Sequence, residues 1–190
     1  MKRRREEGDV WKGLLAGVVG GLVASVVMNK FQAALGKRIT GVERSHGAQS
    51  LQSGSPRQGI GQNLQERGSD EPQDDAAMRL ANAISVGLSG HELTRGEKHT
   101  GGTALHYAYG VSMGALYGAA AELAPVVAAG AGLPYGVSIW VVADEGIVPA
   151  LGLSKQSSEY PLSVHAYALA SHAVYGLTTE VVRRVVRGAL

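Results

Sequence analysis

Two long windows without formal charge constrain this chain more than any other feature of its sequence. Residues 103–121 and 123–143 contain no Lys, Arg, Asp or Glu. A helix on the surface of a water-soluble protein normally carries a charged face, whereas uncharged windows of about this length are typical of helices that cross a membrane. The windows are rich in Ala and Gly rather than Leu, so a soluble helical domain remains the alternative.

The amino-terminal segment predicts another membrane span. Basic residues at 2–5 precede an uncharged run from Gly13 to Met28. A cleaved signal peptide begins in the same way, but this run exceeds a usual signal core and Ala33-Ala34-Leu35 is a poor cleavage site. We therefore expect an uncleaved anchor within residues 1–35.

A fourth apolar window at 161–187 brings the expected number of spans to four, three of them within 103–190. The expected fold is an all-α integral membrane four-helix bundle. The basic residues at the amino terminus, together with three arginines near the carboxyl terminus, place both termini in the cytoplasm. We expect the lipid bilayer as the surroundings of the protein.

A long polar loop is predicted between the first two spans, over residues 36–102. Residues 40–75 are rich in Gly, Ser, Gln and charge, and such a composition is typical of disorder. A short amphipathic helix near 75–89 is expected at the end of the loop, either on the membrane surface or docked on the protein. Its apolar face comprises Met78, Ala81, Ile84, Ser85 and Leu88.

A weak internal repeat groups the four spans into two helical hairpins. An offset of 58 aligns Tyr109, Tyr117, Gly118 and Glu122 with Tyr167, Tyr175, Gly176 and Glu180, and an offset of 115 aligns Gly17 and Gly21 with Gly132 and Gly136. Two hairpins of this kind would have the same orientation, which makes the repeat parallel. Chance similarity between helices of small residues is the alternative.

Glycines at four-residue spacing predict close helix packing. Small residues at this spacing let two helix backbones approach each other in lipid. The spacing does not distinguish contacts within one chain from contacts between two copies, so a homo-oligomer remains open. The two series are Gly13, Gly17, Gly21 and Gly110, Gly114, Gly118.

Seven polar side chains within the apolar windows form the candidate site. Ionisable groups inside a membrane usually face a partner or a water-filled cavity. The set can serve as interhelical hydrogen bonds that fix the bundle, or as a proton-responsive cluster. Its members are His106, Tyr109, Asp144, Glu145, His165, His172 and Tyr175.

Several kinds of site are not expected. The chain has no cysteine, and His165, His172 and Glu145 lack the spacing that places two zinc ligands on adjacent helical turns, so we predict no metal and no cofactor. No catalytic motif is present, and we expect no enzyme activity. A net charge of +2 does not suggest nucleic-acid binding.

The carboxyl-terminal half resembles the YagU-like small bacterial inner-membrane proteins, a family largely without assigned activity. The likeness covers roughly Leu105 to Arg187 and the first span. It rests on the block from Trp140 to Pro149 with Asp144-Glu145, the following LGL, His165, His172 and Tyr175-Gly176. The resemblance implies an integral inner-membrane protein and supplies no reaction.

Two hypotheses for the function therefore remain. The first is a structural or modulatory protein of the bacterial envelope, and the alternative is a small oligomeric proton-linked transporter or channel that uses the polar cluster. The sequence names no substrate.

Overall fold

The computed structural model describes residues 9–40 and 74–190, and this part of the chain is helical without a strand. The expectation of an all-α protein is thus confirmed for the described residues. The long helices are α1 (Val10–Thr40), α2 (Ala76–Ser89), α3 (Arg95–Leu123) and α6 (Leu162–Ala189), and shorter pieces lie between α3 and α6: η2 (Pro125–Gly132), α4 (Leu133–Ile139), η3 (Trp140–Ile147), α5 (Val148–Ala150) and η4 (Ser157–Glu159).

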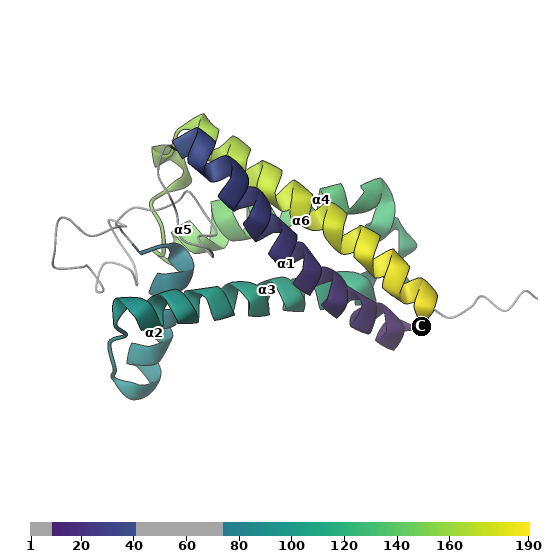
Figure 1. Ribbon diagram of the computed structural model, residues 1–190, viewed down its shortest axis with the longest axis horizontal. Helices are drawn as coiled ribbons and strands as arrows, with labels where there is room; N and C mark the ends of the chain where they lie inside the picture. The colour runs from purple at the N-terminus through teal and green to yellow at the C-terminus, as the bar shows by residue number, and fades with distance from the viewer. Residues whose placement is uncertain (1–8, 41–73) are drawn as a thin grey trace, which may run out of the picture.

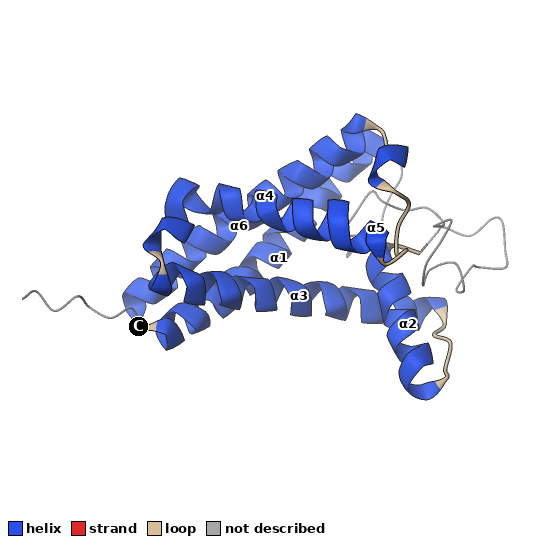
Figure 2. Ribbon diagram, turned by 180° about the vertical axis from the view of Figure 1, so that it is seen from behind, coloured by secondary structure: helices blue, strands red, loops and turns tan. Residues whose placement is uncertain are grey.

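Helix α1 packs against both α3 and α6, whereas α4 packs against α6 and α2 against α3 (Figure 1). The view from behind shows α4 and α5 on the side of the molecule opposite to α1 (Figure 2). The start of α1 lies beside the end of α6, where Lys12 Nζ donates to the Leu190 carbonyl oxygen at 2.9 Å. We call this the Arg end (residues 9–13, 122–124 and 180–190), and the opposite end, with residues 74–102 and 145–165, the α2 end.

The third apolar window does not form one continuous helix. After Pro125, the chain turns through Gly130, Ala131 and Gly132, which all have positive φ. It continues as α-helix from Leu133 and passes into a stretch of π-helix over Trp140–Ile147. The small residues at 130–132 permit the turn, because positive φ is costly for residues with a larger side chain.

Helix α3 begins at Arg95, before the predicted start of the second span at 103. Thr94 caps the helix and forms a capping box with Glu97. Hydrogen bonds from Thr94 lower the pKa of the Glu97 carboxyl below its usual 4.5. A helix start signal in the sequence thus extends the helix into the segment that apolarity assigned to the loop.

Helix α2 docks on α3 through its first half only. Met78 and Ala81 are buried, but Ile84 and Leu88 of the same predicted face are exposed. Arg79 holds this half in place by donating to the Leu153 carbonyl oxygen at 2.9 Å. The predicted disorder of the 40–75 segment, like the basic cluster at 2–5, falls almost wholly outside the described residues.

Two segments of the described chain are long and apolar enough to cross a membrane, Val10–Leu35 and Pro125–Ala150. They correspond to the first and third predicted spans. Helices α3 and α6 occupy the second and fourth windows, and the four-span bundle stays a prediction.

Candidate functional site

Helices α1 and α3 meet through their glycines. A Cβ atom on Gly17 would collide with the Gly114 carbonyl oxygen, and one on Gly21 would collide with that of Gly110. The structure places all six glycines of the predicted zippers at this one antiparallel contact: Gly13, Gly17, Gly21, Gly110, Gly114 and Gly118. Backbone touches backbone here, so no residue with a side chain fits without separating the helices.

A second contact of the same kind joins α4 and α6. Cβ atoms on Gly132 and Gly176 would each collide with the other's carbonyl oxygen. Gly132 thus pairs with Gly176 as Gly13 pairs with Gly118. These contacts align Gly13 with Gly132, an offset of 119, whereas the predicted repeat aligned Gly17 with Gly132, an offset of 115. The two contacts are alike, and the repeat itself remains a prediction.

His165 contacts a carboxylate at the α2 end. Its Nδ1 lies 2.7 Å from Glu145 Oε1, and its Nε2 lies 3.1 Å from the Ser157 carbonyl oxygen. Both oxygens are acceptors, so both contacts are hydrogen bonds at once only when each ring nitrogen carries a proton. The two contacts join the start of α6 to η3 and η4.

His172 lies deeper and has a different carboxylate partner. Its Nδ1 lies 2.9 Å from the Ala168 carbonyl oxygen, one turn earlier on α6, and 3.7 Å from Asp144 Oδ2. The ring is buried. Because Nδ1 donates to Ala168, Nε2 is the nitrogen left to accept a hydrogen bond or exchange a proton.

Both carboxylates come from the π-helical segment η3. A π-helix inserts an extra residue into a turn and is frequently found at functional sites. Here the neighbouring side chains of Asp144 and Glu145 reach two histidines that lie two turns apart on α6. The sequence predicted the residue types, but not the local helix geometry that lets adjacent acids serve separate partners.

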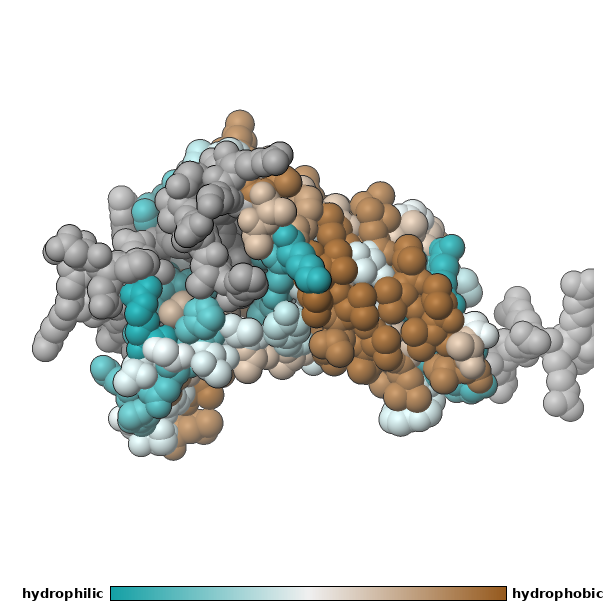
Figure 3. All heavy atoms as spheres, viewed as in Figure 1, coloured by the Kyte–Doolittle hydropathy of each residue, from teal (hydrophilic) through white to brown (hydrophobic). Residues whose placement is uncertain are grey.

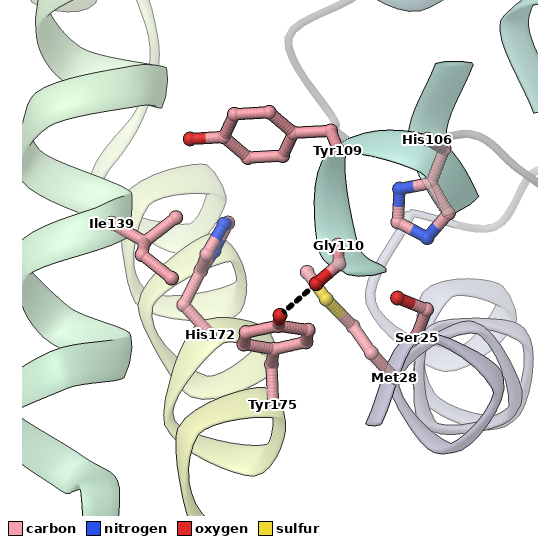
Figure 4. Close-up of a pocket in the computed structure, with 8 residues that line it drawn as sticks. All are labelled: Ser25, Met28, His106, Tyr109, Gly110, Ile139, His172 and Tyr175. Atoms are coloured by element: carbon pink, nitrogen blue, oxygen red, sulfur yellow. Dashed lines mark hydrogen bonds between the residues drawn. The ribbon is translucent and has the colours of Figure 1, made fainter. Parts of the chain in front are cut away.

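A small cavity lies between α1, α3, α4 and α6 (Figure 4). The centre of a water molecule can move within about 20 Å³ of this cavity. This is room for about one water molecule. Tyr175 closes one side by donating its hydroxyl to the Gly110 carbonyl oxygen at 2.5 Å. The lining residues are Ser25, Met28, His106, Tyr109, Gly110, Ile139, His172 and Tyr175.

The predicted polar cluster therefore separates into two parts. His106, Tyr109, His172 and Tyr175 surround the cavity, and Asp144 reaches them through His172. His165 and Glu145 pair with each other nearer the α2 end and do not line the cavity. Within residues 9–40 and 74–190, no group of three potential metal ligands is assembled.

A charged network at the Arg end escaped the sequence analysis. Glu180 is only 1% exposed and accepts hydrogen bonds from Arg183 and Arg184. Arg187 on α6 donates to Glu122 on α3 at 2.7 Å. The spacing of Glu180 to Arg183 and Arg184, three and four residues, is a recognised helical pairing signal. Only the fold brings Glu122 to Arg187.

Other buried polar contacts were also missed. Asn29 Nδ2 of α1 donates to the Tyr107 hydroxyl of α3 at 3.1 Å, and the Tyr167 hydroxyl of α6 donates to the Gln32 carbonyl oxygen at 2.7 Å. Near the Arg end, Tyr117 stacks on Tyr135 with ring centroids 4.3 Å apart. These contacts join helices that are far apart in sequence, and no local pattern signals them.

Many polar side chains are buried beside small apolar residues and tyrosines, while large apolar side chains are exposed. The interior holds buried Asn, Gln, Ser, Thr, His, Glu and Arg side chains, while the largest aliphatic side chains of α1 point outward. Figure 3 shows a continuous hydrophobic surface over the part of α1 toward the Arg end, and hydrophilic atoms around α2. The exposed apolar residues of α1 are Trp11, Leu15, Val19, Leu22, Val23, Val26 and Val27.

Comparison with curated proteins and with solved structures gave no match. A family model, described as protein of unknown function (DUF1440), matches residues 64–181, which is more than half of the chain. This match carries no activity and does not bear on the YagU-like name, but it confirms the expectation of a family without assigned function. The chain belongs to the DUF1440 family.

Proposed function

We propose that this protein is an integral membrane protein of the bacterial envelope, with a structural or modulatory role rather than a catalytic one. The observation that carries this proposal is the exposure of a long apolar surface on α1 together with the burial of many polar side chains. Burial of polar groups and exposure of a large apolar patch are both unfavourable in water. Both become favourable when hydrocarbon surrounds the molecule.

The dimensions support a membrane location. The exposed apolar residues of α1 run from Trp11 to Val27, about 24 Å along a helix with a rise of about 1.5 Å per residue. This approaches the ~30 Å hydrocarbon core of a bilayer. Continuation of α1 to Thr40 leaves further helix for the interface.

Four spans are supported by the arrangement of α3 and α6. Neither helix is as apolar as a typical membrane span, because both carry buried polar residues that face the other helices. Their outward positions are apolar, as at Leu116 on α3 and Val181 on α6. Hydropathy averaged around a helix underestimates such a span, since the polar face never meets lipid.

The orientation follows from the Arg end. Three arginines of α6 lie there beside the start of α1. Positively charged residues are enriched on the cytoplasmic side, so both termini are cytoplasmic and the α2 end lies outside.

A structural role fits the closed interior better than transport does. The glycine contacts leave no space between α1 and α3, and the carboxylates of Glu122 and Glu180 are neutralised by arginines. A cavity for about one water molecule is no path for a solute.

The second candidate function is proton-linked transport, which the two separate histidine–carboxylate pairs favour. Such pairs are suited to binding protons. Four membrane-spanning helices are few for a transporter, so this function would need an oligomer.

Reporter fusions test the membrane proposal directly. We expect alternating locations, outside, inside, outside and inside, for reporters placed after Gly90, Ala124, Lys155 and Leu190. A reporter pattern with every site on one side, or recovery of the chain in the soluble fraction, would overturn the proposal.

Proton flux in liposomes separates the two roles. For a structural protein, His172→Ala and Asp144→Asn lower stability, and the parent protein passes no protons above an empty-liposome control. For a transporter, the parent passes protons and both variants assemble but lose pH-dependent flux. Exposed Glu92 provides the matched variant Glu92→Gln, which should behave like the parent.

A further inference from the structure

The most unusual group in the interior is the His106 ring. Its side chain lies among α1 and α3 and the residue is only 3% exposed. Neither ring nitrogen has a hydrogen-bond partner among the residues that the structure describes. A neutral imidazole has one donor and one acceptor, and a buried polar atom left without a partner is unfavourable.

The cavity beside His106 has the size and the polar groups that a water molecule needs. A buried water requires two to four polar partners and room for about one sphere of its own radius. Besides His106, the polar residues Tyr109, Ser25 and His172 line the cavity, and the Ser25 hydroxyl, which donates to the Gly21 carbonyl oxygen at 2.8 Å, can still accept a hydrogen bond. In the view of Figure 4, the His106 and His172 rings lie on either side of Gly110.

His172 offers the cavity its Nε2 atom. Its Nδ1 is occupied by the Ala168 carbonyl oxygen, with Asp144 Oδ2 3.7 Å away. This arrangement fixes the tautomer of the neutral ring with its proton on Nδ1, and Nε2 then accepts a hydrogen bond. One water molecule can therefore donate to His172 while it contacts His106.

We propose that the cavity holds a water molecule that joins His106 to His172, so that His106, His172 and Asp144 exchange protons as one unit. When His172 is charged, its Nε2 proton passes to the water oxygen, and the water passes one of its own protons to a His106 nitrogen. The number of protons is unchanged, and only the charged ring differs. The inference takes the membrane location proposed above as its setting, because the lipid would keep bulk water from the cavity.

The groups around the water define the charge of the unit. Helix α3 contributes His106 and Tyr109, η3 contributes Asp144, and α6 contributes His172 and Tyr175. Helices α1 and α4 contribute only the uncharged side chains of Ser25, Met28 and Ile139 to the lining. Asp144 is the only carboxylate among these groups in the described chain, and it compensates one positive charge.

The direct test is the contact between water and the His106 ring, measured by magnetic resonance with labelled histidine and tryptophan in nanodiscs. Trp140 is a control within the parent protein, since its indole Nε1 is also buried without a hydrogen-bond partner in the described residues but does not line the cavity. We expect transfer from water to His106 and none to Trp140. Absence of transfer at His106 would overturn the proposal.

Coupling is tested with two matched variants. Asp144→Asn removes the carboxylate beside His172, and Glu145→Gln removes the neighbouring carboxylate that contacts His165. We expect Asp144→Asn to change the imidazole resonances of His106 and His172 together, because the two rings exchange protons through the same water molecule. Glu145→Gln should leave both unchanged, and a response of His172 alone would contradict the shared unit.

The membrane location and the water molecule in the cavity can be refuted independently of each other. Reporter fusions decide the location of the helices without reference to the cavity. If the chain proves soluble, the same water contact is measured in buffer on the same ring, so the outcome for His106 does not depend on the outcome for the membrane.

Discussion

Substitution of Gly114 by Ala is the sharpest test of the contact between α1 and α3. A Cβ atom at this position would lie 2.6 Å from Gly21 Cα and 2.7 Å from Gly21 N, and closer still to the Gly17 carbonyl oxygen. All three atoms are backbone, so no side chain can rotate away. Ordinary contact begins near 3.4 Å, and the helices must separate here by about 1 Å to relieve the closest of these contacts.

The expected cost follows from that separation. A gap of 0.5–1 Å loses roughly a quarter to a half of the dispersion attraction between facing atoms, and overpacking typically costs about 1–3 kcal/mol. The higher helix propensity of Ala offsets about 1 kcal/mol of this cost. Because every clash involves backbone, we expect the upper part of the range and a net loss of about 2 kcal/mol in the free energy of unfolding.

Gly87→Ala is the matched control, since it makes the same chemical change in α2 with no atom within 4 Å of the added Cβ. This variant should be stabilised by up to about 1 kcal/mol. Unfolding followed by circular dichroism in detergent measures both. A Gly114→Ala protein as stable as the parent would refute the reasoning, because the backbones would then not be in direct contact.

Three further predictions concern polar groups. Glu180→Gln should cost about 3 kcal/mol, because it leaves the buried Arg183 without its bidentate partner; combined with Arg183→Met in denaturation experiments, it should cost less than alone, and additive losses would contradict the pairing. Tyr175→Phe should cost about 1 kcal/mol of thermal stability by removing the hydrogen bond to α3, and no change would show that the bond contributes nothing. The pKa of Glu97 is lowered in the folded protein, so its carboxylate stabilises the start of α3 fully above pH 4.5 and loses this effect as pH falls through the lowered pKa. Glu97→Gln should abolish that acid dependence of amide exchange in the first turn of α3, and an unaltered dependence would exclude this role.

The sequence by itself determined the helical class, the apolar windows and the spacing of the glycines. Helical periodicity and glycine spacing are local properties, and they survive in any arrangement that keeps the helices. The same holds for Glu180 and Arg183, which the helix brings together at a spacing of three. Positive φ at Gly130 and Gly132 breaks the third window, and the glycines there could have signalled the turn.

Only the tertiary structure decided which groups meet. Seven polar residues were predicted as one cluster, but the π-helix of η3 directs Glu145 to His165 and Asp144 to His172. His106 of α3 faces a cavity that residues of α1, α4 and α6 complete, and no spacing within one helix contains such a relation. Distances between helices depend on the packing of backbones, and a sequence pattern fixes the face of each helix without fixing the partner that it meets.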